Sequence, residues 1–444
     1  MDVFKRLSPE LIAPILSSLP DLKSLYNIVK ASPYVFHFFN SPHGAAILDD
    51  LLGSWGQAIE DKDVYVRDME GEEGSMKCRE HGALPWVPLI LRLVALIRHC
   101  TSTNQPADSF ECLFLKYFMP KNNDNGHEFV HDLQLPPDNI PRIRLEDVID
   151  GPQSFSPREM LILIRKIKVL SEECFQFFYG RMQATTPQHL VDKSFDLGPL
   201  PWNYRHDGQP WGEPYELDAG PAPSRWEMQG LIFGFCNLQL RYELSTAIHE
   251  GRLDWSASDA EAIRDLGSAE KCSPELGAWT LLNSWESVWS AVLYVRYLEG
   301  VPDESSCVGN TDGENRRILF NDTGFRPLTG GRLRLPQPKY ETSDFEWPTT
   351  TSRQPLLPPF DNFFAINCRF VIGVNGGLCA QDIFSFESTS ELTAGLLFRP
   401  FRRLGFGIWD VERLHGRSIG GVLSIDLGTR LESWFSSPQV AQFV

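Results

Sequence analysis

Residues 7–25 of the chain read LSPELIAPILSSLPDLKSL, and this stretch decides how the first part of the protein folds. Ser8 is a good helix N-cap, Pro9 fits the first helical position, and Glu10 suits the positive end of the helix dipole. Aliphatic side chains then recur at three- and four-residue spacing until Pro20 ends the pattern. The stretch therefore predicts a short first helix with a wide apolar stripe.

Two further short helices are expected directly after it. The second helix carries its apolar residues on one face, at Leu22, Leu25, Ile28 and Val29. Ser32 and Pro33 then repeat the cap-then-proline signal and open a third helix. Pro14 falls inside the first helix, where it predicts a kink or loosened first turns. A segment so short and apolar cannot bury all its side chains against itself, so it predicts a partner surface.

Composition limits the classes of function. The chain has 444 residues with 42% hydrophobic and 12% aromatic content, which predicts a folded protein with two or three packed regions. Its 58 acidic residues against 41 basic ones give a net charge of −17, and no strongly basic segment is present. Such a molecule repels phosphate backbones and anionic membranes, so we expect no nucleic-acid or membrane partner. No segment resembles an uninterrupted membrane span.

The nine cysteines are scattered along the chain rather than paired at close spacing. A secreted disulfide framework is denser, so we expect reduced thiols that behave as small core residues. The first residues lack the features of a signal peptide. The expected compartment is the cytoplasm, the nucleus or both.

Apolar periodicity predicts helices through most of the next two hundred residues. They are expected at 84–120, from 156 to about 183, and near 225–250 and 274–299. Short strands are expected at 370–372 and 422–425. The fold class is therefore mostly α, with a three-helix N-terminal module, a large helical body and a smaller α+β or irregular C-terminal part. The expected divisions are 1–45, a body at 46–300, a polar Pro/Gly-rich loop or insertion at 301–360, and 361–444.

The N-terminal module resembles an F-box, the helical segment through which substrate receptors of cullin-type ubiquitin ligases hold a Skp adaptor. The likeness rests on a leucine and a proline, a glutamate–leucine pair, an apolar pair, and leucines leading into a second helix. It is similar to the divergent F-box-like proteins of filamentous fungi. The resemblance implies that the adaptor is bound by Leu7, Pro9, Leu11, Ile12, Ile15, Leu16, Leu19, Leu22 and Leu25.

The resemblance implies a non-catalytic receptor that needs no cofactor. Its module would bind the adaptor and through it a cullin, while residues beyond about 80 would recruit a target protein. An interaction scaffold working outside a ligase is the alternative. The third helix departs from the family pattern, with Tyr34-Val35-Phe36 where a basic residue and a tryptophan are usual. The segment 404–410, LGFGIWD, is similar to a C-terminal stretch in such proteins but carries no known activity.

A rival hypothesis is a zinc hydrolase. His127-Glu128-Phe129-Val130-His131 is a literal H-E-x-x-H, which on a helix places two imidazoles on one face with the glutamate as general base. An Asn/Asp/Gly run before it and two prolines after it leave room for barely two helical turns. A third ligand could come from Glu146 or Glu159. We expect a polar surface turn here and no metal.

Aromatic residues gather in the fourth predicted helix, at Trp279, Trp285, Trp289, Tyr294 and Tyr297. They could line a binding pocket. Their helical spacing is more typical of core residues, so burial is the expectation.

Overall fold

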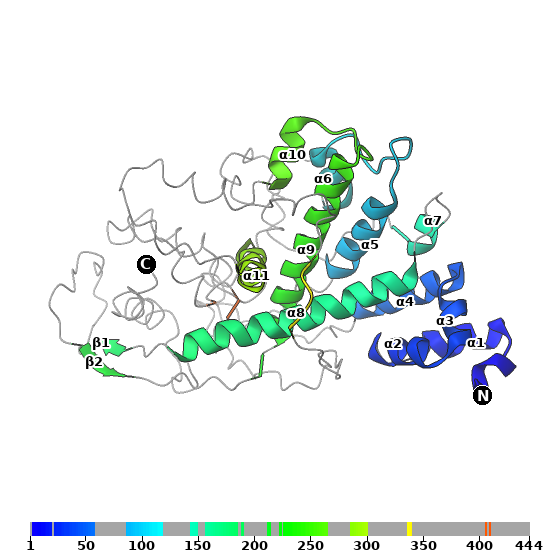
Figure 1. The fold of residues 1–444 in the computed structure, drawn as a ribbon, viewed down its shortest axis with the longest axis horizontal. Coiled ribbons are helices and arrows are strands. Elements are labelled where there is room, and N and C mark those ends of the chain that lie inside the picture. The colour runs from blue at the N-terminus through cyan, green and yellow to red at the C-terminus, as the bar shows by residue number, and fades with distance from the viewer. Residues whose placement is uncertain are drawn as a thin grey trace, which may run out of the picture.

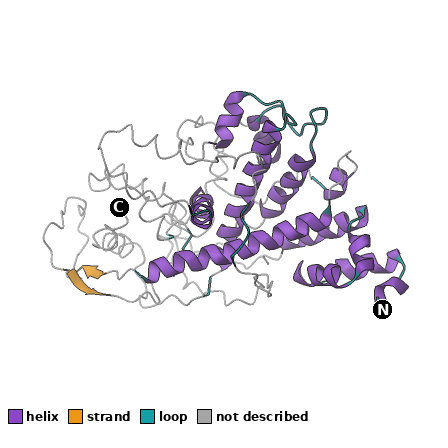
Figure 2. Cartoon of the chain, in the orientation of Figure 1, coloured by secondary structure: helices purple, strands orange, loops and turns teal. Residues whose placement is uncertain are grey.

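The computed structural model describes residues 2–19, 22–57, 86–118, 143–149, 156–184, 188–190, 211–214, 222–223, 225–264, 285–300, 335–339, 405 and 408–409. In these ranges the protein is mostly helical, so the predicted mostly-α class is confirmed there (Figure 2). The strands expected at 370–372 and 422–425 lie outside the described residues, as do most of the 301–360 and 361–444 divisions.

The helices and strands follow in this order along the chain. They are η1 (Val3–Arg6), α1 (Pro9–Ser17), α2 (Leu22–Ala31), α3 (Pro33–Phe39), α4 (Pro42–Gln57), α5 (Trp86–His99), α6 (Phe110–Phe118), α7 (Leu145–Ile149), α8 (Pro157–Gln183), β1 (Gln188–Leu190), β2 (Trp211–Pro214), α9 (Arg225–His249), α10 (Ala257–Arg264) and α11 (Trp285–Leu298). β1 and β2 form an antiparallel pair that the sequence did not predict. The expected helix at 84–120 is two helices, α5 and α6.

Two long helices, α8 and α9, organise the body and cross each other (Figure 1). Both agree with the sequence prediction to within a residue or two. Ser156 caps α8, because its hydroxyl accepts a hydrogen bond from the Glu159 N–H at 3.4 Å, and Pro157 occupies the first helical position. α9 packs against α5, α8, α10 and α11.

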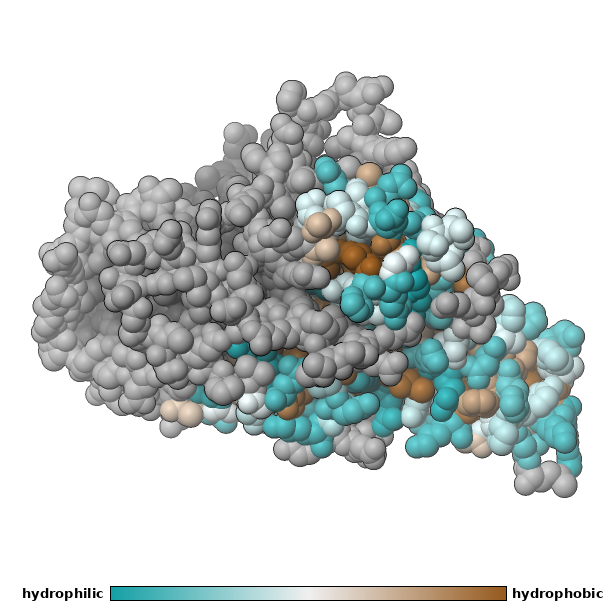
Figure 3. Space-filling model, turned by 45° about the horizontal axis from the view of Figure 1, so that its top comes forward, coloured by the Kyte–Doolittle hydropathy of each residue, from teal (hydrophilic) through white to brown (hydrophobic). Residues whose placement is uncertain are grey.

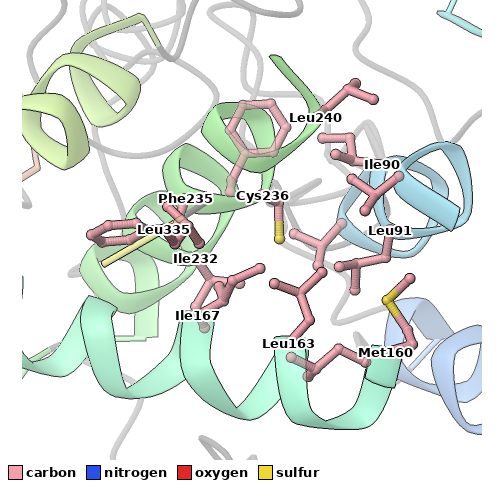
Figure 4. Packing of buried hydrophobic residues seen from close by; sticks show 14 of the residues in the cluster. Ile90, Leu91, Met160, Leu163, Ile167, Ile232, Phe235, Cys236, Leu240 and Leu335 are labelled. Atoms are coloured by element: carbon pink, nitrogen blue, oxygen red, sulfur yellow. The ribbon is translucent and has the colours of Figure 1, made fainter. Parts of the chain in front are cut away.

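α9 is buried on every side over residues 227–244. A helix that is surrounded in this way needs apolar neighbours on several faces. Figure 4 shows how they are supplied: Leu163 and Ile167 point from α8, and Ile90 and Leu91 point from α5, toward the α9 side chains. Gly234 lets α11 approach closely, since a Cβ atom there would lie 2.5 Å from the Ser287 carbonyl oxygen.

The buried face of α9 toward α5 carries an ion pair. Arg98 Nε donates to Glu243 Oε1 at 2.9 Å, and Gln239 Nε2 donates to the same oxygen at 2.9 Å. The Arg98 and Glu243 side chains are only 17% and 6% exposed. Removing one partner of such a buried pair leaves the other charge poorly compensated, which costs far more than losing an exposed pair. The pair therefore fixes the position of α5 on α9.

We predict that Arg98→Met lowers the free energy of unfolding by about 3 kcal/mol. The double variant Arg98→Met/Glu243→Gln should recover part of this loss, with a coupling energy of about 1–3 kcal/mol in urea unfolding. The matched control is Arg144→Met, which removes an exposed pair with Glu146 and should change stability by less than ~0.5 kcal/mol. Equal losses at Arg98 and Arg144 would contradict this account.

A segment near the end of the sequence, which includes Gly405 and Trp409, packs against the C-terminal half of α8. Trp409 is fully buried, and its ring meets that of Phe175 edge-to-face at 5.4 Å between centroids. Gly405 has φ +87°, and a Cβ atom there would lie 2.7 Å from Trp409 Cε2 and 2.9 Å from Phe178 Cβ. Only glycine fits such a position without strain. These residues belong to the 404–410 segment, so part of that segment is a core element.

We predict that Trp409→Ala lowers the free energy of unfolding by about 3–5 kcal/mol, because it leaves a cavity against Phe175 and Phe178. Trp409→Phe keeps an aromatic ring at the site and should cost distinctly less. Chemical denaturation of both variants measures the difference. A loss below ~1 kcal/mol for Trp409→Ala would show that the burial of this ring matters little.

The N-terminal module and the body share one helix. α4 packs on α1 and α3 of the module and on α5, α7 and α8 of the body. The predicted boundary between residues 45 and 46 falls inside this helix. α4 is not among the helices that the sequence predicts, although its buried residues recur at helical spacing at Ala45, Leu48 and Leu52.

The first turns of α8 also contact the module. The Arg165 guanidinium lies 4.7 Å from the centre of the Tyr26 ring, and its Nη1 donates to the Tyr26 hydroxyl at 2.8 Å. The Arg158 guanidinium lies 4.9 Å from the centre of the Phe36 ring. Together with α4, these contacts fix the orientation of the module on the body.

Three described cysteines behave as expected, and one does not. Cys100, Cys174 and Cys236 are free and buried, and burial raises the pKa of each thiol. Cys112 is free but exposed, which corrects the expectation of a core residue there. Within the described part of the chain, no helix combines the length and apolar character needed to cross a bilayer.

Candidate protein-interaction surface

α1 is built by local signals that the sequence contains. Ser8 has extended backbone angles, and its carbonyl oxygen accepts from the N–H groups of Leu11 and Ile12 at 3.0 and 3.1 Å. A hydrogen bond from Ser8 lowers the pKa of the Glu10 carboxyl. At the other end, the Ser18 hydroxyl donates to the Ile15 carbonyl oxygen at 2.8 Å. The helix runs from Pro9 to Ser17 without interruption at Pro14.

The two faces of α1 differ sharply. Ile12 and Leu16, four residues apart, are fully buried, whereas Leu11 and Ile15 are 55% and 38% exposed. The second pair forms an apolar outer row on the surface of the module. Pro9 and Pro14 are exposed on the same helix, and Val3 of η1 is 70% exposed. In Figure 3 apolar residues, in brown, alternate with hydrophilic ones on this end of the molecule.

The structure divides the nine residues that the sequence assigned to adaptor binding. Pro9, Leu11 and Ile15 are exposed, and Leu7 and Leu19 are half-buried against the core. The remaining four are buried within the chain itself, at Ile12, Leu16, Leu22 and Leu25. A side chain that is buried in this way supports the surface from below and does not offer a contact to a partner.

The buried row is covered by the protein's own helices. α1 packs on α4, and α2 packs on α3. The chain start is held to α3 as well, because Asp2 Oδ2 accepts hydrogen bonds from the Ser32 hydroxyl at 2.7 Å and the Tyr34 N–H at 3.1 Å. These bonds, that from Ser32 above all, lower the pKa of the Asp2 carboxyl. The buried row of α1 is therefore packed against other helices of the same chain, whereas the outer row faces solvent.

The charge of the module differs from that of the whole chain. Residues 1–40 contain four lysines or arginines and three carboxylates, against a net charge of −17 for the protein. The outer row is thus set in a nearly neutral surface. Charge repulsion does not oppose the approach of an acidic or neutral protein to it.

The exposed apolar area limits the free energy that this surface could contribute to binding a partner. Complete burial of a leucine-sized side chain contributes about 1.5–3 kcal/mol, and the outer row is already partly covered. Val3, Leu11 and Ile15 would therefore contribute roughly 2–5 kcal/mol in total. Association itself costs about 4–15 kcal/mol, so a stable complex needs further contacts from Leu7, Pro9 and their neighbours. Counting all nine predicted residues would overstate the interface.

We predict a clear difference in stability between the two rows of α1. Ile12→Ala and Leu16→Ala should each lower the free energy of unfolding by about 2–5 kcal/mol, because each leaves a cavity. Leu11→Ala and Ile15→Ala should change it by less than ~0.5 kcal/mol, since these side chains face solvent. Urea unfolding followed by circular dichroism measures both pairs. Similar losses in the two pairs would contradict the assignment of the faces.

Two of the exposed apolar residues, Val3 and Pro14, are not among those that the sequence assigns to adaptor binding. Pro14 is expected only to disturb the helix, and Val3 has no expected role. A helical projection of residues 9–17 is a signal that could have separated the inner from the outer row. It could not have fixed which row faces inward, because that depends on the position of α4.

His127, Glu128 and His131 lie outside the described residues. Of the two glutamates considered as a third zinc ligand, Glu146 receives a hydrogen bond from Arg144 at 2.9 Å, and the backbone of Glu159 takes part in the cap of α8. Within the described ranges, no three His, Cys, Asp or Glu side chains are grouped so that they could hold a metal ion.

Comparison of the chain with family models, curated proteins and solved structures found no match.

Proposed function

We propose that the protein is a non-catalytic, F-box-like substrate receptor of a Skp–cullin ubiquitin ligase. Its outer row would bind the Skp-type adaptor, and its helical body would hold a target protein. The receptor would act by proximity, because it keeps the target close to the catalytic subunit of the ligase. The proposed compartment is the cytoplasm, the nucleus or both.

One observation supports this proposal above the others. The first α-helix of the chain folds on its own supporting helices and still leaves Leu11 and Ile15 in solvent, 55% and 38% exposed. These two belong to the glutamate–leucine pair and the apolar pair on which the F-box resemblance rests. A row of aliphatic side chains in a nearly neutral surface is suited to an apolar groove on another protein.

The attachment of the module supports a receptor role. α4 is common to the module and the body, and the contacts of Arg158 with Phe36 and of Arg165 with Tyr26 add a second connection. A target on the body would therefore be held at a defined distance from an adaptor on the module. Transfer by proximity depends on such a fixed geometry.

Co-expression with a Skp-type adaptor tests the proposal. We predict that the wild-type chain co-purifies with the adaptor and that Leu11→Asp/Ile15→Asp does not, because two charges would have to be buried in an apolar interface. The measurement is the amount of adaptor recovered on the tagged chain. The matched control is Ile162→Asp, which places a charge at a 40% exposed isoleucine on a different helix, α8.

Both variants must first give the circular dichroism spectrum and urea midpoint of a folded chain. Full recovery of the adaptor by Leu11→Asp/Ile15→Asp would count decisively against the proposal. Loss of the adaptor in Ile162→Asp as well would show that the effect is not specific to the outer row.

Experiments with the same purified proteins distinguish the proposed receptor from two alternative functions. A scaffold that works outside a ligase would bind the adaptor but fail to recruit a cullin, which a three-component co-purification detects. The zinc hydrolase hypothesis is tested by metal analysis of the purified chain, in which stoichiometric zinc that is lost in His127→Ala/His131→Ala would support it.

A further inference from the structure

A short proline-bearing segment of the chain lies against the body at the crossing of the long helices. It comprises residues 335–339, Leu-Pro-Gln-Pro-Lys. The side chain of Leu335 is 2% exposed, and Figure 4 shows it beside Ile232 and Phe235 of α9. The segment begins near α9 and reaches α8 and α11 at its other end.

The body holds the backbone of this segment at both ends. Lys166 Nζ donates to the Leu335 carbonyl oxygen, and the Lys339 N–H donates to Glu173 Oε2 at 3.1 Å. Lys166 and Glu173 are seven residues apart on α8, which corresponds to about 10.5 Å along the helix. Four residues of extended, polyproline-like chain span about 12 Å. Anchors at this separation fit a nearly extended segment, and Figure 1 shows it, in yellow, lying along α9 and crossing α8.

The two ends of the segment are recognised by different chemistry. Lys339 Nζ lies 4.0 Å from the centre of the Tyr297 ring, and Tyr297 is 45% exposed instead of buried as the sequence suggested. The ring of Tyr297 is in turn supported by Phe177, whose ring lies 4.5 Å away between centroids. At the other end Leu335 is inserted among aliphatic and aromatic side chains. We call Lys166, Glu173, Ile232, Phe235 and Tyr297 the segment-binding surface.

Hydrogen bonding from Tyr294 orients the Glu173 carboxylate that accepts from the backbone of the segment. Glu173 is 7% exposed and accepts a hydrogen bond from the Tyr294 hydroxyl at 2.9 Å in addition to the Lys339 N–H. Burial above all, and then the bond to Glu173, raises the pKa of Tyr294. Tyr294 therefore stays protonated and donates, which orients the carboxylate toward the backbone of the segment.

The pattern of exposure along the segment is that of a bound peptide. Leu335 is buried, Pro336 and Pro338 are half-buried, and Gln337 and Lys339 are exposed. The two prolines lack N–H groups, so the segment leaves few donors to be satisfied, and their fixed φ angles lower the entropy lost on binding. Recognition of proline-rich peptides on aromatic surfaces uses the same physical features.

We propose that the segment-binding surface is the target site of the receptor, that it takes extended peptides of the form aliphatic-Pro-x-Pro-basic, and that residues 335–339 occupy it as a tethered competitor. The assignment as a target site rests on the proposed receptor function, whereas peptide binding does not depend on it. A tethered segment competes at an effective concentration on the order of millimolar, so a target has to be abundant or held at a second site.

The probe is a fluorescein-labelled synthetic peptide with the sequence of residues 334–340, and the measurement is fluorescence anisotropy with the full-length chain. We expect Leu335→Ser/Lys339→Glu in the chain to bind this peptide roughly tenfold or more tightly than the wild type, because the tethered competitor is weakened. Lys339→Glu alone changes only an exposed side chain, so it keeps the test valid if the double variant fails to fold. It should give a smaller gain of the same sign.

Variants of the surface supply the matched controls. In the Lys339→Glu background, Tyr297→Ala should weaken peptide binding several-fold, while Tyr297→Phe, which keeps a ring face for the cation, should not. A labelled peptide that carries glutamate in place of lysine should bind more weakly as well. If neither released chain binds the peptide better than the wild type, or if Tyr297→Ala has no effect, residues 335–339 are a permanent part of the fold and the proposal fails.

Two further comparisons separate this proposal from the receptor function. Leu11→Asp/Ile15→Asp should leave peptide binding unchanged, and Tyr297→Ala should leave capture of the Skp-type adaptor unchanged. Peptide binding without adaptor capture would overturn the receptor function and retain the peptide site. Adaptor capture without peptide binding would do the reverse.

Discussion

The burial of α9 is the constraint on which the rest of the structure depends. A helix that is buried throughout residues 227–244 needs partners on several sides, and α5, α8 and α11 supply them. Apolar contacts give most of the free energy but little directional information. The hydrogen-bonded pair of Arg98 and Glu243 adds that information, because it satisfies both charges in only one alignment of α5 on α9. The other elements take their places around this core.

Two surfaces are carried by this core, and they differ in how complete they are. The outer row of α1 is apolar and open to solvent, and a second polypeptide would cover it. The segment-binding surface already holds a piece of the same chain, through one buried leucine, two backbone hydrogen bonds and a cation over an aromatic ring. Both are attached to α8, the first through α4 and Arg165 and the second directly. The proposed receptor function would require such an arrangement, with the two surfaces held at a fixed separation.

The sequence predicted elements whose signals are local and missed those that depend on distant neighbours. Ser156 and Pro157 marked the start of α8, and apolar periodicity marked α9, because capping and amphipathicity act within a few residues. The burial of Ile12 but not Leu11 depends on where α4 lies, which no local pattern contains. The segment-binding surface, which holds residues 335–339, is formed by side chains from three helices, so the spacing of residues along the sequence could not predict it. Tyr297 looked like a core residue and instead supports a lysine.

The docking of Trp409 on α8 has a consequence for the way the protein is made. Phe175 and Phe178 leave the ribosome more than two hundred residues before the ring that covers them, so these aromatic side chains stay uncovered while most of the chain is being synthesised. Contacts of such long sequence separation form late and slow the completion of folding. During that interval the nascent chain exposes apolar surface that chaperones recognise, and a product that ends before Gly405 lacks the Trp409 ring that packs on Phe175.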